Sequence, residues 1–157
     1  MTVTTTDPRY PLSDLHHVGI VVADLEEGAA EVQRRYGMTI RLFPEQTYPC
    51  RIRGRDEAPR TRIGLSVEGP PHLELLREVP GFEPWTPVPG LHHLGYVVSD
   101  LAAAARQMED TGSPMLMGGV RGTEFPVGTT YHNDPLGHIV ELLDTATAES
   151  LAHRLES

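Results

Sequence analysis

The feature that most limits how this chain can fold is an internal repeat. Residues 15–25 read LHHVGIVVADL, and residues 91–101 read LHHLGYVVSDL, 76 positions later (91 − 15). Each copy places a double histidine and a glycine within an apolar run rich in β-branched residues, which is typical of a strand. An aspartate follows, Asp24 or Asp100, whose carboxylate can cap the first turn of a helix. The repeat therefore predicts two units that each begin with a strand and continue into a helix.

Three short strand-like runs follow each predicted helix. The helices are expected to end at Gly37 and Gly112, since glycine is the usual C-terminal stop. The runs lie at residues 39–43, 61–67 and 72–78 in the first copy and at 115–118, 129–131 and 138–143 in the second. Each copy thus has the order β-α-β-β-β, and the predicted fold class is α+β.

The repeat also divides the chain. The 157 residues are the size of one domain, so we expect a single domain over residues 1–157. Its expected parts are a first module at about 13–78, a linker at 79–90, a second module at about 91–144 and a C-terminal helix at 145–156. Four prolines in the linker forbid a long helix or a central strand there.

Composition excludes several classes of function. The formal net charge is −9, and an acidic chain rarely offers the basic face that nucleic-acid binding needs. The apolar runs are too short to cross a bilayer, and the N-terminal sequence MTVTTTDPRYP lacks the order of a signal peptide. We therefore expect a cytoplasmic protein that binds neither nucleic acid nor membrane. The single cysteine, Cys50, can form neither an internal disulfide nor a thiolate cluster, so nitrogen and oxygen must carry any metal chemistry.

The last strands of the two copies also match. Residues 72–76 read HLELL and residues 139–143 read IVELL, with Glu74 and Glu141 at the shared position. A carboxylate inside an apolar strand is costly to bury unless a cation or hydrogen bonds compensate its charge. From the second histidine to this glutamate the first copy spans 57 positions (74 − 17) and the second 48 (141 − 93), so the first carries nine more (57 − 48). We place them in an arginine-rich loop or hairpin at about 45–60.

Strand alternation assigns the two histidines of each doublet to different faces. Successive side chains of a strand point to opposite faces, so His17 shares its face with Gly19, while His16 points the other way. The second copy repeats this order. The missing side chain at Gly19 predicts room for a bound group on that face. We interpret His16 and His92 as structural residues, or as outer supports of a neighbouring ligand.

Together these residues resemble the vicinal oxygen chelate superfamily, which includes glyoxalase I, methylmalonyl-CoA epimerase, extradiol dioxygenases and fosfomycin-resistance enzymes. The resemblance runs from residue 15 to residue 144, and residues 131–141, YHNDPLGHIVE, are similar to the closing signature of the family. It implies two βαβββ modules that form a cupped mixed sheet around one divalent metal. Carried over position by position, it implies four metal ligands, which are His17, Glu74, His93 and Glu141.

Such a ligand set suits Zn, Ni, Co, Mn or Fe(II) and leaves two open positions on a six-coordinate ion. Two oxygens of one small substrate can take those positions, which favours chemistry at the carbon beside a carbonyl. The resemblance therefore implies a glyoxalase I-like or epimerase-like lyase or isomerase. Glu141 would be both ligand and proton-transfer base, and Glu74 a ligand or the opposite base. Glutamate at position 74 resembles glyoxalase I, whereas the epimerases commonly carry glutamine there.

Two other functions are the alternatives. An extradiol-type dioxygenase needs a third open position for O2, which a fourth protein ligand disfavours. Metal-free members that bind a small molecule such as an antibiotic dispense with the ligands, and all four are present here. The resemblance also implies a second base in the epimerases, at a position that falls on Arg53 in this chain. The nearby Glu45 lies several positions out of register, so this chain lacks a carboxylate at that position, which argues against epimerisation by that pair of bases.

Five arginines lie close together within residues 51–62. We expect Arg53 and Arg62 to bind an anionic part of the substrate, such as the carboxylates of glutathione or the phosphates of a coenzyme-A thioester, because guanidinium groups match both. A solvated hairpin is the other interpretation. The apolar strand faces predict a homodimer, with the modules paired within one chain or across the two.

Overall fold

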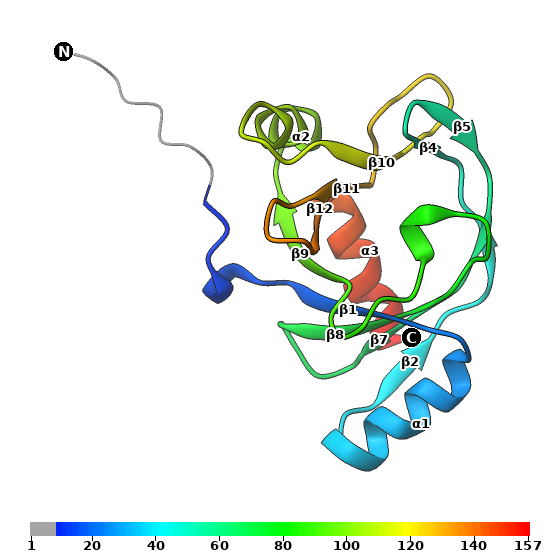
Figure 1. The fold of residues 1–157 in the computed structure, drawn as a ribbon. Coiled ribbons are helices and arrows are strands. Elements are labelled where there is room, and N and C mark those ends of the chain that lie inside the picture. The colour runs from blue at the N-terminus through cyan, green and yellow to red at the C-terminus, as the bar shows by residue number, and fades with distance from the viewer. Residues whose placement is uncertain (1–8) are drawn as a thin grey trace.

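A computed structural model describes residues 9–157, which form three α-helices and one large mixed sheet (Figure 1). The first copy of the repeat forms β1 (His17–Val22), α1 (Leu25–Tyr36), β2 (Ile40–Leu42), β7 (Ile63–Ser66) and β8 (His72–Arg77). The second copy forms β9 (His93–Val98), α2 (Leu101–Asp110), β10 (Met115–Gly119), β11 (Thr129–Asn133) and β12 (Ile139–Asp144). The predicted α+β class and the order β-α-β-β-β are confirmed.

Three further segments complete the described chain. The C-terminal helix expected at 145–156 is α3 (Thr145–Glu156), and two 3-10 turns are η1 (Leu12–Asp14) and η2 (Glu83–Trp85). Residues 1–8 lie outside the described residues. They include most of the N-terminal sequence from which we expect no signal peptide, so the structure does not test that expectation. No helix within residues 9–157 is long and apolar enough to span a membrane. The division of the whole chain into one domain with the module boundaries given above stays a prediction.

The repeat helices begin at the aspartates that the sequence indicates. The side chains of Asp24 and Asp100 accept hydrogen bonds from the backbone N–H three residues later, at 2.9 Å and 3.0 Å. Gly37 ends α1 with a φ of +68°, the left-handed conformation that favours glycine. The second helix ends at Asp110 with Thr111 as its C-cap, and Gly112 follows directly with a φ of +100°, so this glycine stops the helix as expected.

The two copies join through their first strands. The ten strands of the main sheet have the order β2-β7-β8-β1-β9-β12-β11-β10-β4-β5, in which β4 is Cys50–Ile52 and β5 is Arg55–Glu57. β1 and β9 are antiparallel, with His17 opposite Gly95 and Gly19 opposite His93. β1 is also parallel to β8, and β9 is parallel to β12. The first and last strands of both copies therefore lie side by side at the centre of the sheet.

The additional residues of the first copy form a hairpin, as the sequence predicts. Its strands are β4 (Cys50–Ile52) and β5 (Arg55–Glu57), and a separate two-stranded sheet is formed by β3 (Gln46–Thr47) and β6 (Arg60–Thr61). β4 pairs antiparallel with β10, so this hairpin lies along the edge of the second copy. That long-range pairing covers an edge strand that would otherwise expose unpaired backbone groups.

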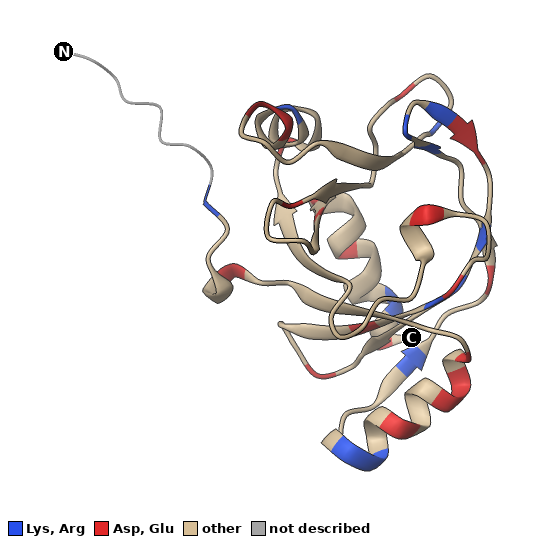
Figure 2. Cartoon of the chain, in the orientation of Figure 1, with Lys and Arg blue, Asp and Glu red and all other residues tan. Residues whose placement is uncertain are grey.

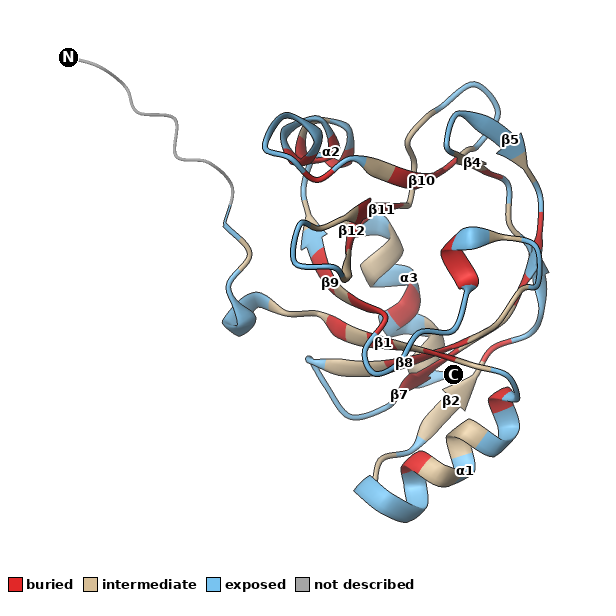
Figure 3. Cartoon of the chain, in the orientation of Figure 1, coloured by how far each residue is buried: buried red, intermediate tan, exposed pale blue. Residues whose placement is uncertain are grey.

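Alternation gives the central strands two distinct faces. On the outer face, α1 packs through Leu25 and Val32 on the first copy, and α2 packs through Leu101 and Met108 on the second. On the inner face, α3 packs its Leu151 against apolar residues of both copies. Figure 1 shows α3 inside the curve of the sheet, and Figure 3 shows buried residues gathered on the central strands.

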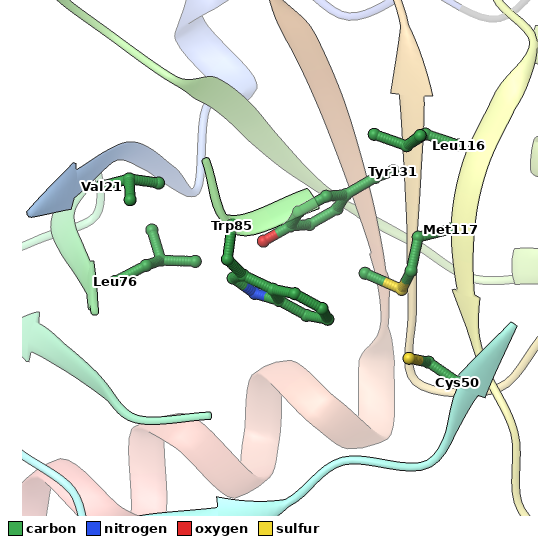
Figure 4. Close-up of a cluster of buried hydrophobic side chains, with 7 residues drawn as sticks. All are labelled: Val21, Cys50, Leu76, Trp85, Leu116, Met117 and Tyr131. Carbon is green, nitrogen blue, oxygen red and sulfur yellow. The ribbon is translucent and has the colours of Figure 1, made fainter. Parts of the chain in front are cut away.

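An apolar cluster fills the inner side of the cup next to the linker. Trp85, on the 3-10 turn of the linker, is only 4% exposed, and Figure 4 shows it beside Tyr131, between Val21 and Leu76 on one side and strands β10 and β4 on the other. Cys50 belongs to this cluster, and burial raises the pKa of its thiol to about 12. The thiol therefore stays protonated and inert near neutral pH.

Candidate metal centre

Four side chains from four adjacent strands meet on the inner face of the sheet. They are His17 on β1, Glu74 on β8, His93 on β9 and Glu141 on β12, and all four are buried. Their donor atoms lie within 4.8 Å of one another. The Nε2 atoms of the two histidines are 3.0 Å apart, and Glu141 Oε1 lies 3.3 Å from that of His17 and 3.1 Å from that of His93. The structure thus brings together the four residues that the sequence singles out.

The glycine in each copy of the repeat makes room for a histidine of the other copy. A Cβ atom added at Gly19 would lie 1.9 Å from the ring of His93, and one added at Gly95 would lie 2.2 Å from the ring of His17. Both separations are far inside van der Waals contact. The space that the sequence assigns to a bound group is therefore occupied by a histidine ring of the other copy. This explains why histidine and glycine recur together at the same spacing.

The charges at this site are strongly coupled. Burial alone would lower the pKa of His93, but the neighbouring carboxylates of Glu141 and Glu74 outweigh it and raise this pKa to about 9. Burial alone would raise the pKa of Glu141, but the charge of His17 and hydrogen bonds from both histidines hold it well below its usual range. In the metal-free protein, the second copy therefore carries an ionised carboxylate beside a protonated histidine.

Glu74 has an oxygen without a hydrogen bond. Among the described residues, its buried Oε1 has no hydrogen-bond partner. That atom lies 3.1 Å from His93 Nε2 and 3.7 Å from His17 Nε2, but the first contact lacks hydrogen-bond direction, so we count it as attraction between charges. A buried carboxylate oxygen without a donor is costly unless a cation satisfies it. The orphan oxygen is therefore evidence for a cation at this point.

The spacing of the donors also fits a metal ion. Zinc–nitrogen and zinc–oxygen bonds are about 2.1 Å long, so neighbouring donors lie about 3.0 Å apart in an octahedron and about 3.4 Å apart in a tetrahedron. The separations between each histidine Nε2 and the other donors run from 3.0 to 3.7 Å. Imidazole and carboxylate together suit borderline divalent ions. Both the distances and the donor chemistry are those of a metal centre.

A cavity of about 160 Å³ opens beside the two glutamates. Glu74 and Glu141 lie in its wall, together with the apolar side chains of Leu76, Trp85 and Met117. The two-stranded sheet of β3 and β6 contributes one side of the wall, and α3 contributes another. The cavity therefore combines two carboxylates with a surface that excludes much of the water around a small substrate.

One arginine lines this cavity, and it is not one that the sequence indicates. Arg154 on α3 lies in the wall, with its guanidinium carbon 4.1 Å from the centroid of the Phe43 ring. No acidic side chain within residues 9–157 pairs with it. Its spacing of three residues from the predicted apolar position Leu151 places it on the same helical face, which is the signal that could have found it.

The expected substrate contacts Arg53 and Arg62 lie elsewhere. Arg53 pairs with Glu83 at 2.6 Å, Arg62 pairs with Glu26 at 2.5 Å, and neither arginine lines the cavity. Figure 2 shows the basic residues of the hairpin next to acidic ones. Glu45, the other residue weighed as a second base, is paired with two arginines, and it too is outside the wall. The assignment of Arg53 and Arg62 to the substrate stays a prediction.

Of two further neighbours of the centre, Tyr131 was not singled out as functional by the sequence, and His92 was interpreted only as a structural residue or an outer support. The hydroxyl of buried Tyr131 donates to Glu141, and burial raises the pKa of this tyrosine well above its usual value. Tyr131 stands directly opposite Glu141 in the β11–β12 pair, so its role depends on strand register. His92 directly precedes a proposed ligand, and burial lowers its pKa to about 4. Its ring is therefore neutral near pH 7.

Comparison with known proteins gives consistent matches. The family model described as Glyoxalase/Bleomycin resistance protein/Dioxygenase superfamily matches residues 16–131. An ethylmalonyl-CoA/methylmalonyl-CoA epimerase of Cereibacter sphaeroides is 29% identical over 134 residues, which cover 82% of this chain and 95% of the relative.

Solved structures of similar fold include epimerases. Methylmalonyl-CoA epimerase from Mycobacterium tuberculosis superposes with a TM-score of 0.57 at 23% identity, covering 96% of this chain and 97% of that one. A single-substitution variant of the Streptomyces coelicolor methylmalonyl-CoA epimerase in complex with 2-nitronate-propionyl-CoA superposes with a TM-score of 0.55 at 20% identity, covering 85% and 97%. At these identities, the likeness shows a shared fold.

Proposed function

The chain belongs to the glyoxalase/bleomycin resistance protein/dioxygenase superfamily, and from this premise we propose that it is a metal-dependent isomerase or lyase that moves a proton on the carbon beside a carbonyl. The observation that carries the proposal is the buried cluster of two histidines and two glutamates, in which Glu74 keeps an oxygen without a hydrogen bond. Its substrate is a small molecule with two neighbouring oxygens.

The proposed ligands are His17, Glu74, His93 and Glu141. A divalent Zn, Ni, Co, Mn or Fe ion held by them would supply positive charge next to the carbonyl oxygen and so favour loss of the adjacent proton. Glu141 takes up that proton. Its Oε1 faces both histidines, so we assign the proton to Oε2. The Tyr131 hydroxyl, which donates to Glu141, holds this carboxylate in place.

Epimerisation is the form of this chemistry that we favour. It requires a proton to leave one face of a carbon and another proton to arrive on the opposite face. Glu74 and Glu141 come from opposite copies of the repeat, and both border the cavity. The relatives named above are epimerases of malonyl-type thioesters, which makes a 2-substituted acyl thioester the first substrate to test. A glyoxalase I-like reaction is the second candidate, because position 74 carries glutamate.

Arg154 is assigned to the negatively charged part of the substrate. It lies in the cavity wall without an acidic partner within residues 9–157, and its guanidinium is held against the Phe43 ring. A guanidinium in such a place can donate two hydrogen bonds to one carboxylate or phosphate. Arg53 and Arg62 remain proposed contacts for a part of the substrate that extends outside the cavity. A homodimer and a cytoplasmic location also belong to the proposal.

The experiment loads the protein with Zn, Ni, Co, Mn or Fe(II) and incubates it with methylmalonyl-CoA in deuterated water. We expect deuterium at the carbon between the two carbonyls, together with inversion of that carbon. A His17→Ala/His93→Ala variant is the control for spontaneous exchange. The hemithioacetal of methylglyoxal and glutathione is tested in parallel, and product from it alone would favour the glyoxalase I-like reaction. Oxygen consumption with a catechol would instead support the dioxygenase alternative.

A further inference from the structure

Each proposed histidine ligand has another histidine directly before it, and the two rings meet in the same way in both copies. The Nδ1 atoms of His16 and His17 are 2.8 Å apart, and those of His92 and His93 are 2.9 Å apart. The two pairs of ring planes cross at 86° and 83°. Two ring nitrogens at this distance form a hydrogen bond only if one carries hydrogen and the other presents a lone pair. The direction of this bond determines which nitrogen of the ligand is free.

The opposite nitrogens of His17 and His93 face the cluster of donors. Their Nε2 atoms are 3.0 Å apart and share contacts with Glu141 Oε1. A metal ligand must be an unprotonated nitrogen, so each Nε2 has to present its lone pair. In a neutral imidazole the hydrogen then sits on Nδ1, which must donate to the preceding ring. His16 and His92 are therefore the acceptors, each through its own Nδ1.

The surroundings of His92 support this direction independently. The backbone carbonyl of Pro84 is hydrogen-bonded to His92, and a carbonyl oxygen can only accept. Because Nδ1 of His92 already faces His93, the nitrogen that donates to Pro84 is Nε2, which leaves the lone pair on Nδ1. His92 is only 3% exposed, so water competes little for these bonds. A line of hydrogen bonds thus runs from His93 through His92 to the linker.

We propose that His16 and His92 are positioning residues, which hold His17 and His93 in the tautomer with hydrogen on Nδ1 and with Nε2 directed at a divalent metal. This inference rests on the proposed metal centre and gives a reason for the second histidine in each copy. His16 and His92 directly precede β1 and β9 and neither lines the cavity, so the first histidine supports the second from outside it. Outer partners of metal-bound histidines contribute about 10- to 100-fold to metal affinity.

The test compares two substitutions at the same two positions. The variant His16→Leu/His92→Leu keeps apolar bulk and removes both acceptors, whereas His16→Asn/His92→Asn retains an acceptor oxygen near the place of each Nδ1. In competition with a chelator, we expect the leucine pair to bind Zn²⁺ about 10- to 100-fold more weakly than the unchanged protein. The asparagine pair should recover most of that loss. His153→Leu, which removes an exposed histidine of α3, should leave the affinity unchanged.

Two further measurements separate positioning from a general effect on the fold. The thermal midpoint of each metal-free variant reports folding, and ¹H–¹⁵N spectra of the ring nitrogens in the Zn²⁺-loaded protein report the tautomers of His17 and His93. If the leucine pair fails to fold, His16→Leu alone is measured, because His16 is the less buried of the two. Unchanged Zn²⁺ affinity in a folded leucine variant, or no recovery with asparagine, would overturn the inference. If the protein without any substitution binds no divalent metal, that result would instead overturn the proposed metal centre.

Discussion

The two copies of the repeat supply the same donors but surround them differently. In the second copy, Glu141 contacts both ligand histidines and accepts from Tyr131. In the first copy, Glu74 keeps a buried Oε1 without a hydrogen bond among the described residues. The second copy thus holds its carboxylate in place without a metal, whereas the oxygen of the first lies near His93 and His17 but has no hydrogen bond, which leaves it available to a cation. The two copies are therefore similar in sequence but differ in the chemical surroundings of their glutamates.

The supporting histidines differ in the same direction. His92 is buried and bonded to the Pro84 carbonyl, whereas His16 is only partly buried and packs beside His72. The linker that follows the first copy thus contacts the second copy. The hairpin of the first copy likewise lies along the edge of the second, through the β4–β10 pair. Each difference adds a contact to the second copy.

The largest expected effect comes from replacing each of the two glutamates in turn with glutamine. Glu141→Gln should keep much of the metal and lower turnover by about two to four orders of magnitude, the usual contribution of a general base. If the glutamates serve opposite faces of the carbon, Glu74→Gln should block inversion but still exchange the proton of one enantiomer. Deuterium uptake by each enantiomer of the substrate measures both effects. Wild-type exchange rates in Glu141→Gln would remove this residue from the role of base.

The pH dependence of metal binding should report on the second copy. The raised pKa of His93, about 9, means that the metal-free protein keeps a proton there at pH 7, and a metal must displace it. Affinity for Zn²⁺ should therefore rise by about tenfold per pH unit from pH 7 to pH 9 and then level off. Calorimetry in buffers of different ionisation heat should detect about one proton released per metal at pH 7.

The same raised pKa has a consequence for stability without metal. A pKa that is higher in the folded state stabilises the fold fully below pH 6.5, the ordinary pKa of histidine, and this contribution disappears as pH rises through about 9. Unfolding in urea at several pH values measures this contribution to the free energy of unfolding. Metal affinity that stays flat between pH 7 and pH 9 would contradict the proposed coupling of His93 to the two carboxylates.

Substitution of the repeat glycines should test how closely the two copies fit. Gly95→Ala would place a methyl group against the ring of His17, and Gly19→Ala would do the same to His93. We expect a loss of about 1–3 kcal/mol in stability from overpacking and a fall in metal affinity of about 10- to 100-fold from the displaced ligand. Gly28→Ala on α1 is the control, since its methyl group would meet only side-chain carbons at 3.3 Å or more. Equal affinities in all three variants would refute the mutual packing.

The smallest expected effect concerns the arginines. Arg154→Ala should raise KM for an anionic substrate by about tenfold, near the lower limit for a hydrogen bond to a charged group. Arg106 on α2 lies outside the cavity wall, so Arg106→Ala should leave KM unchanged. Arg53→Ala and Arg62→Ala should change KM less than Arg154→Ala, because their ion pairs hold them outside the cavity. The reverse order would restore the hairpin as the main anion site.

The sequence allowed most of the architecture to be predicted. The repeat placed both β-α-β-β-β units, the helix caps at Asp24 and Asp100 and the extra hairpin, because these features depend on local period and capping chemistry. The four candidate ligands were named from the resemblance to a known superfamily, supported by their matching places in both copies. Local patterns were enough for the architecture, and the ligand assignment stays a prediction.

Features that depend on which strands become neighbours could not be predicted in the same way. The opposite placement of Gly19 and His93 follows from the antiparallel register of β1 and β9, and the contact between Tyr131 and Glu141 follows from the register of β11 and β12. Arg154 reaches the cavity only because α3 folds into the curve of the sheet. Neither strand register nor helix docking is written in the spacing of residues along one strand.

The most direct test of the central claim is the metal content of the purified protein. If His17, Glu74, His93 and Glu141 form one centre, elemental analysis after reconstitution and desalting should find one divalent ion per chain. The His17→Ala/His93→Ala variant, which loses a ligand from each copy, should retain almost none. Stoichiometric metal in that variant would contradict the assignment of the four side chains to one metal centre.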